Sequence, residues 1–181
     1  MVGQRLHSLM VSGVLLVGVL LGVSAATALE VGEPAPAFML PATTGGNISL
    51  SRFQGQKLVL LEFYMGDFMP TCVANLSTRK ADYSKFRELN VQILAISASY
   101  STSQKALTDT LDLPFPVLSD FPELKAIRSY GVLHTSPIMA RRAFFLIDKH
   151  GVVRGRWLAD DSATFASEPI LQVAREVVGK P

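Results

Sequence analysis

Cysteine is the scarcest informative residue in this 181-residue sequence, which contains only Cys72. A single thiol excludes an intramolecular disulfide and therefore a disulfide-stapled scaffold. The sequence also lacks a large excess of either charge, because 17 basic and 15 acidic side chains leave a formal net charge of +2. So small an excess gives no electrostatic reason to expect nucleic-acid binding. The length, with no internal repeat or low-complexity segment, predicts one folded domain of ordinary size.

The first 28 residues have the composition of an export signal. Arg5 and the amino terminus supply positive charge, residues 11–23 form an apolar core, and Ala26-Thr27-Ala28 fits a cleavage site. We therefore expect a signal peptide at 1–28, cleavage after Ala28, and a periplasmic or secreted domain at 29–181. An uncleaved membrane anchor is the alternative, although the apolar run is short for a membrane span.

Apolar runs and amphipathic segments alternate along residues 29–181. This alternation predicts an α/β domain whose central mixed β-sheet is flanked by helices. The pattern predicts strands at 58–65, 91–97, 143–148 and 152–157, short extended segments at 48–50 and 115–118, and helices at 71–89, 103–111, 122–130 and 170–178.

Cys72 lies where the strand predicted at 58–65 leads into the helix predicted at 71–89. The first N–H groups of a helix have no partner within the helix, and together with the helix dipole they favour a thiolate over a thiol. We therefore regard Cys72 as a candidate redox-active cysteine; the alternative is a small buried apolar residue.

Five segments, in this order, resemble the peroxiredoxin family, the alkyl hydroperoxide reductase and thiol-specific antioxidant branch of the thioredoxin fold. The resemblance covers about residues 30–180, and the segments are 31–38, 63–72, 113–120, 130–132 and 142–148 followed by Gly151. It implies a thioredoxin-like redoxin domain. It also implies that Cys72 is the peroxidatic cysteine, and that Arg142, at the position of the family's active-site arginine, is the second catalytic residue.

The chemistry implied by this resemblance is thiol-dependent peroxide reduction with antioxidant function. The Cys72 thiolate would attack a peroxide and become a sulfenic acid, while Arg142 would favour the thiolate and donate hydrogen bonds to the leaving oxygen. Because no second cysteine is present, an external thiol reductant would regenerate Cys72. No cofactor or metal is expected, and a homodimer is one assembly that the resemblance implies.

The segment before Cys72 departs from the family pattern while supplying the expected substrate pocket, formed by Met65, Met69, Pro70 and Thr71. Met65 stands where the family has proline, and Met69 stands where it has threonine or serine. A thioether cannot donate a hydrogen bond as that hydroxyl does. Core filling is the ordinary interpretation of both methionines. The alternative is a Cu(I) site, in which their soft thioethers and the sulfur of Cys72 would be the ligands.

Two further positions bear on the function. Asn75 and Phe144 also replace residues that are usual in the family, an acid and a Thr or Ser respectively. These departures leave an alternative function open: a non-catalytic or disulfide-exchanging accessory protein of an exported redox system. Disulfide exchange would need an external partner, because position 75 is asparagine rather than the second cysteine of a C-x-x-C motif.

Overall fold

The computed structural model describes residues 29–136 and 138–179. The signal peptide or anchor predicted at 1–28 lies outside the described residues. Among the helices that are described, none has the length and apolar character needed to cross a membrane.

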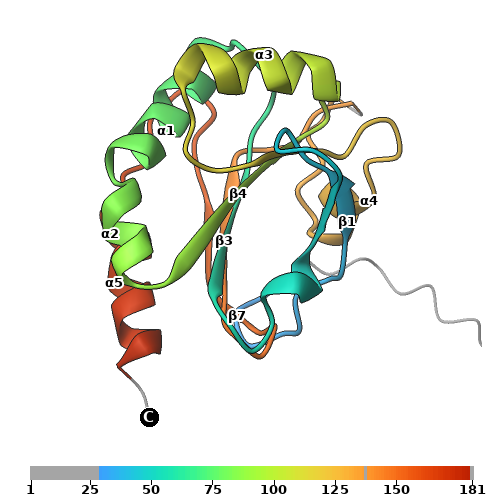
Figure 1. The fold of residues 1–181 in the computed structure, drawn as a ribbon. Helices are drawn as coiled ribbons and strands as arrows, with labels where there is room; N and C mark the ends of the chain where they lie inside the picture. The colour runs from blue at the N-terminus through green and yellow to red at the C-terminus, as the bar shows by residue number, and fades with distance from the viewer. Residues whose placement is uncertain (1–28, 137, 180–181) are drawn as a thin grey trace, which may run out of the picture.

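A five-stranded sheet forms the centre of the domain, with the strand order β5-β4-β3-β6-β7 (Figure 1). The three strands β3, β4 and β5 are parallel to one another, whereas β6 is antiparallel to both β3 and β7. This arrangement confirms the predicted mixed sheet. Its strands are β3 (Leu58–Phe63), β4 (Val91–Ser97), β5 (Val117–Ser119), β6 (Ala143–Ile147) and β7 (Val153–Leu158).

Two apolar layers cover the two faces of this sheet. One contains side chains of the N-terminal hairpin, the short 3-10 helix and α4, and the other contains side chains of α1, α2, α3 and α5. Every residue of β3 and β6 is buried, as expected of strands covered on both faces. The covering elements are β1 (Met39–Pro41), β2 (Asn47–Ser49), η1 (Leu50–Phe53), α1 (Pro70–Ala81), α2 (Tyr83–Glu88), α3 (Ser101–Leu111), α4 (Lys125–Ser129) and α5 (Glu168–Val178).

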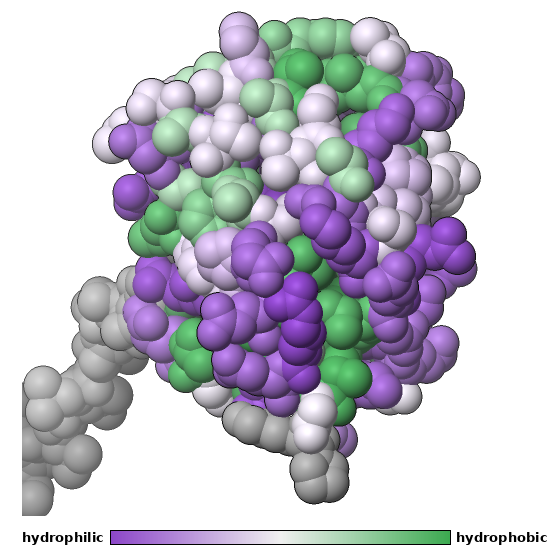
Figure 2. All heavy atoms as spheres, turned by 90° about the vertical axis from the view of Figure 1, so that its left-hand side faces the viewer, coloured by the Kyte–Doolittle hydropathy of each residue, from purple (hydrophilic) through white to green (hydrophobic). Residues whose placement is uncertain are grey.

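The helices α1, α2 and α5 lie along one side of the domain (Figure 1). Seen from that side, hydrophilic residues gather over the lower half, where α2 and α5 lie, and more hydrophobic residues show towards the top (Figure 2). The lower helices therefore bury one apolar side against the sheet and present a polar side outwards, as amphipathic helices do.

The prediction of a single helix over 71–89 is wrong, because α1 and α2 meet at Asp82. The Asp82 backbone has φ −94° and ψ 9°, and it ends α1 and precedes α2. Its carboxylate accepts a hydrogen bond from Lys85 at 2.7 Å. Aspartate has low helix propensity and favours helix ends, so a local preference interrupts an apolar stripe that continues through the break.

The helix predicted over 122–130 is also shorter, since α4 begins only at Lys125. Leu124 has a left-handed backbone, with φ +54°, which cannot continue a helix. Asp120 then accepts hydrogen bonds from the N–H groups of Ala126 and Ile127, at 3.2 and 2.7 Å. A buried carboxylate therefore satisfies helix N–H groups that have no partner within the helix.

Candidate functional site

Cys72 is the third residue of α1 and is completely buried. Pro70 opens the helix, where its fixed φ is favourable and its missing N–H costs nothing. Met69 at the N-cap makes no side-chain hydrogen bond to the helix. The thiol therefore lies in the first turn of a helix, among N–H groups that favour negative charge.

Arg142 comes to Cys72 from the start of β6, the strand that lies next to β3 in the sheet. It immediately precedes β6, where Ala143 pairs with Phe63 at the end of β3. This register places Arg142 beside the segment that leads into α1. One guanidinium nitrogen, Nη2, lies 3.5 Å from the Cys72 sulfur and donates towards it. The structure thus brings together the two residues expected to be catalytic.

The segment 160–167 holds the other guanidinium nitrogen of Arg142. Nη1 donates to the carbonyl oxygens of Asp160 and Ala163, at 2.8 and 3.2 Å. Buried Asn75 fixes the same segment, because its Oδ1 accepts from the N–H of Phe165 at 2.8 Å. Its amide nitrogen donates to Thr71 O at 2.7 Å and lies 3.5 Å from Ala163 O. Arg142 is therefore oriented by backbone carbonyls.

The segment between β3 and α1 forms the wall of the site. Met65 and Met69 are partly buried and pack against the apolar cluster that contains Cys72. A Cβ at Gly66 would lie 3.5 Å from the Met69 sulfur, so this thioether covers the turn closely. Of the other predicted pocket residues, Thr71 is partly buried and Pro70 is exposed.

Tyr64 anchors this wall at its start. Its hydroxyl donates to Asp67 at 2.7 Å. Burial, reinforced by the charge of Asp67, holds the pKa of Tyr64 well above its ordinary value, so the phenol stays protonated and remains a donor. Phe68 follows in a left-handed conformation, with φ +58°, and its side chain is half exposed. A bulky residue with positive φ is uncommon and marks a locally constrained turn.

Sequence reasoning missed a buried ion pair beneath the site. Glu62 lies within β3 and Arg79 lies on α1, and both side chains are fully buried with 3.2 Å between Nε and Oε2. Burial raises the pKa of Glu62, and the neighbouring Arg79 opposes this shift. The only available signal was a carboxylate inside an otherwise apolar run, which by itself names no partner.

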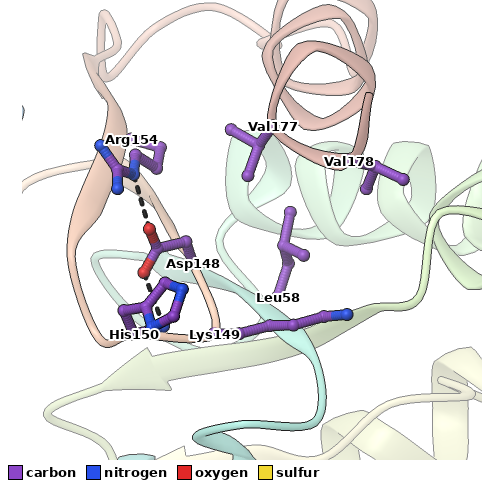
Figure 3. Close-up of a pocket in the computed structure, with 7 residues that line it drawn as sticks. All are labelled: Leu58, Asp148, Lys149, His150, Arg154, Val177 and Val178. Carbon is purple, nitrogen blue, oxygen red and sulfur yellow. Dashed lines mark hydrogen bonds and ion pairs between the residues drawn. The ribbon is translucent and has the colours of Figure 1, made fainter. Parts of the chain in front are cut away.

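A cavity of about 370 Å³ lies at the opposite end of the sheet from Cys72. Leu58 begins β3, whereas Cys72 follows its end, and Asp148 follows the end of antiparallel β6. In this cavity Asp148 contacts Arg154 and the backbone of His150 (Figure 3). The cavity is lined by Leu58, Asp148, Lys149, His150, Arg154, Val177 and Val178. It is therefore separate from the thiol site.

The described residues contain no group of three His, Cys, Asp or Glu side chains arranged to hold a metal ion. Cys72 is the one cysteine of the chain, and its polar neighbour within hydrogen-bond distance is Arg142. This arrangement suits chemistry at sulfur, with the guanidinium stabilising negative charge on the thiol or on an oxygen bound beside it.

The sequence is similar to those of known peroxiredoxins. The chain is 34% identical over 124 residues to a chloroplastic peroxiredoxin Q of Suaeda salsa, covering 68% of this chain and 57% of that protein. It is 35% identical over 136 residues to the peroxiredoxin tpx1 of Schizosaccharomyces pombe, covering 70% of each. The chain thus spans less than two thirds of the plant relative's length.

A solved structure supports the same assignment. The reduced 2-Cys peroxiredoxin of Plasmodium vivax superposes with a TM-score of 0.76 at 28% identity, covering 81% of both chains. This similarity confirms the thioredoxin-like fold expected from the sequence. The model of the AhpC/TSA family matches residues 31–156, which is more than half of the sequence. The chain therefore belongs to the AhpC/TSA family of peroxiredoxins.

Proposed function

We propose that this protein is an exported, one-cysteine thiol peroxidase that reduces peroxides through Cys72. The observation that carries the proposal is the 3.5 Å contact between Arg142 Nη2 and the Cys72 sulfur in the first turn of α1. Helix N–H groups and a buried guanidinium both favour a thiolate, which is the nucleophilic form of cysteine.

The reaction begins when the thiolate attacks one oxygen of the peroxide. An S–O bond forms and the O–O bond breaks, so sulfur is oxidised to a sulfenic acid and the peroxide is reduced. The leaving oxygen departs as water or alcohol after it takes up a proton. Arg142 stabilises the negative charge that develops on this oxygen, because its donors are already held in place by Asp160 and Ala163.

Regeneration requires thiols from outside the chain, since the sequence has a single cysteine. A first thiol condenses with the sulfenic acid, giving a mixed disulfide and water. A second thiol attacks that disulfide, restores Cys72 and leaves as the oxidised partner. The proposal places this cycle in the periplasm or outside the cell, following the export signal, and in a homodimer, following the family resemblance.

The test is stoichiometric oxidation of the reduced protein by hydrogen peroxide. Sulfenic acid at Cys72 is followed by intact mass and by a trapping reagent, with Cys72→Ser as the blank. We expect rapid addition of one oxygen in the wild type and a loss of roughly 100-fold in rate in Arg142→Gln. Arg141→Gln is the matched control, because the neighbouring Arg141 side chain is exposed, and it should react like the wild type.

A second candidate is a non-catalytic or disulfide-exchanging accessory protein of an exported redox system. Complete burial of Cys72 beneath partly buried Met65 and Met69 favours the non-catalytic form of this candidate, because a covered thiol meets a partner slowly. Oxidation of Cys72 no faster than that of a free thiol would reject the peroxidase and support this candidate.

A further inference from the structure

Glu62 and Arg79 form a second buried polar contact, which takes no direct part in the contact between Cys72 and Arg142. Both side chains are fully buried. Removing two charges from water is unfavourable, and the mutual attraction of the ions often fails to offset this loss of hydration. A well-packed apolar pair would often be as stable at such a position. The ion pair therefore calls for an explanation other than stability.

The pair lies in the same layer of the domain as the thiol. Position 79 on α1 follows Cys72 by seven residues, or about two helical turns, so both side chains lie on the sheet-facing side of the helix. Glu62 pairs in register with Phe144 on β6, and the Arg79 guanidinium lies 5.2 Å from the centre of that ring. The ion pair thus connects α1 to β3, and its neighbour β6 begins directly after Arg142.

Arg79 also holds the segment that orients Arg142. Its two terminal nitrogens donate to the carbonyl oxygen of Phe165 and to the hydroxyl of Ser167. Its remaining nitrogen, Nε, faces Glu62. A planar guanidinium can serve three such partners in fixed directions, which a lysine ammonium cannot do. Glu62 therefore sets the orientation of a donor group that clamps residues 165–167.

The same segment, residues 160–167, also contacts Arg142. Asp160 and Ala163 accept the hydrogen bonds from Arg142, and Ala163 lies two residues before Phe165. Asn75 links Ala163 and Phe165 through its side-chain amide. A continuous set of contacts thus runs from the ion pair through residues 163–167 to Arg142 and the thiol.

We propose that the Glu62–Arg79 ion pair is a positioning element of the Cys72 centre, which keeps segment 160–167 in the place where its carbonyl oxygens hold Arg142 against the sulfur. Arg79 and Glu62 act through Arg142 and do not touch the thiol. The proposal rests on the proposed function in one respect: the rate of peroxide reduction should follow the position of Arg142.

The experiment compares the wild type with Glu62→Leu/Arg79→Met, which replaces the pair by apolar side chains of similar size. Three quantities are measured: the free energy of unfolding in urea, the thiolate fraction of Cys72 by ultraviolet absorbance against a Cys72→Ser blank, and the rate of sulfenic-acid formation. The thiolate measurement needs no peroxidase activity. A wild type that fails to react with peroxide would reject the peroxidase while still testing the positioning.

The thiolate readout must be interpreted against every charged group around Cys72. The charged and titratable groups of the site come from four parts of the fold: Glu62 from β3, Tyr64 and Asp67 from the segment that follows β3, Arg79 from α1, and Arg142, which contacts the sulfur, with Asp160 and Asp161 beside it. The double substitution removes one positive and one negative charge together. It therefore leaves the net charge of the surroundings unchanged.

We expect the double variant to fold but to unfold at a lower urea concentration than the wild type, because Phe165 and Ser167 lose the hydrogen bonds that Arg79 donates to them. We expect its thiolate fraction near neutral pH to be lower than that of the wild type, and its oxidation rate to fall by roughly tenfold or more. Unchanged thiolate fraction and unchanged oxidation rate would overturn the proposal and leave the pair with a purely structural role.

Two further variants keep the test decisive. Arg79→Lys preserves the charge opposite Glu62 but loses the fork that reaches Phe165 and Ser167, so we expect a reduced thiolate fraction in this variant as well. A Lys variant identical to the wild type in thiolate fraction would overturn the proposal even if the double variant failed to fold. Asp148→Asn, at the far end of the sheet, is the control for lost stability and should leave the thiolate fraction unchanged.

Discussion

Cys72 and Arg142 are 70 residues apart in the chain, yet their functional atoms lie 3.5 Å from each other. Each could be named from the sequence, Cys72 as the single thiol at a helix start and Arg142 through its place in the family pattern. The carbonyl oxygens that orient Arg142 could not be named, because every residue supplies the same backbone group. At this scale the sequence identifies the side chains of the candidate site better than it identifies the groups that orient them.

Met69 belongs to the predicted substrate pocket and is also the N-cap of α1, so a substitution there affects the stability of this helix. As the N-cap of α1 it provides no side-chain oxygen for the first helix N–H groups. We expect Met69→Thr to be about 1 kcal/mol more stable than Met69→Val, since only the hydroxyl can cap the helix. Urea unfolding of the two variants measures this difference. Because Val and Thr have similar shapes, equal stability of the pair would show that the hydroxyl does not cap α1.

In strand β7 the position of the Trp157 ring depends on the absence of a side chain at Gly155. Gly155 lies beneath the indole of Trp157, and a Cβ at position 155 would be 2.7 Å from Cζ3 of that ring. We expect Gly155→Ala to displace the ring and to lower the free energy of unfolding by about 1–3 kcal/mol. Trp157 is the only tryptophan, so its fluorescence emission reports the displacement directly.

The control for this prediction is a smaller ring at position 157. In a Trp157→Phe background the same Gly155→Ala substitution should cost less, because the clash involves the outer atoms of the indole. An equal cost in both backgrounds would mean that the loss arises from the backbone of β7 and has nothing to do with Trp157.

The length of the helices is also decided at the level of elements. Asp82 divides the predicted helix 71–89, and Leu124 delays the start of α4. An apolar stripe repeats over many residues and predicts that a helix exists, but its ends depend on single residues and their hydrogen bonds. The existence of these helices was therefore predictable, whereas their boundaries were not.

The stability of the whole molecule should depend on pH through Asp148, at the end of the sheet opposite the thiol. Burial alone would raise the pKa of this carboxyl. The N–H groups of Val152 and His150, at 3.0 and 2.8 Å, and Arg154, at 2.6 Å, outweigh burial and hold that pKa below the ordinary value of 3.8. The folded state therefore binds the proton more weakly than the unfolded state.

The sign of the effect follows from this depressed pKa. The stabilisation is fully present above 3.8 and is lost as the pH falls through the lower pKa of the folded protein. We expect Asp148→Asn to be about 1.5–3 kcal/mol less stable at neutral pH, the value of hydrogen bonds to a charged group. Urea unfolding at neutral and at acidic pH should show the difference shrinking in acid. A difference independent of pH would mean that the charge of Asp148 contributes nothing.

The sequence by itself determined the α/β class, the order of the main strands and helices, and the place of the single thiol at the start of a helix. These features follow from local patterns: apolar runs, helical periodicity and the proline that opens α1. The tertiary structure decided which distant side chains meet, because the pairing of β6 with β3 brings Arg142 to Cys72.

The buried partnership of Glu62 and Arg79 was likewise decided only by the packing of α1 on the sheet. Burial of a charge is favourable only when a specific partner reaches it, and that partner depends on strand register and helix orientation. Neither is encoded in any short stretch of residues, so the groups that hold the thiol site together emerge only in the folded molecule.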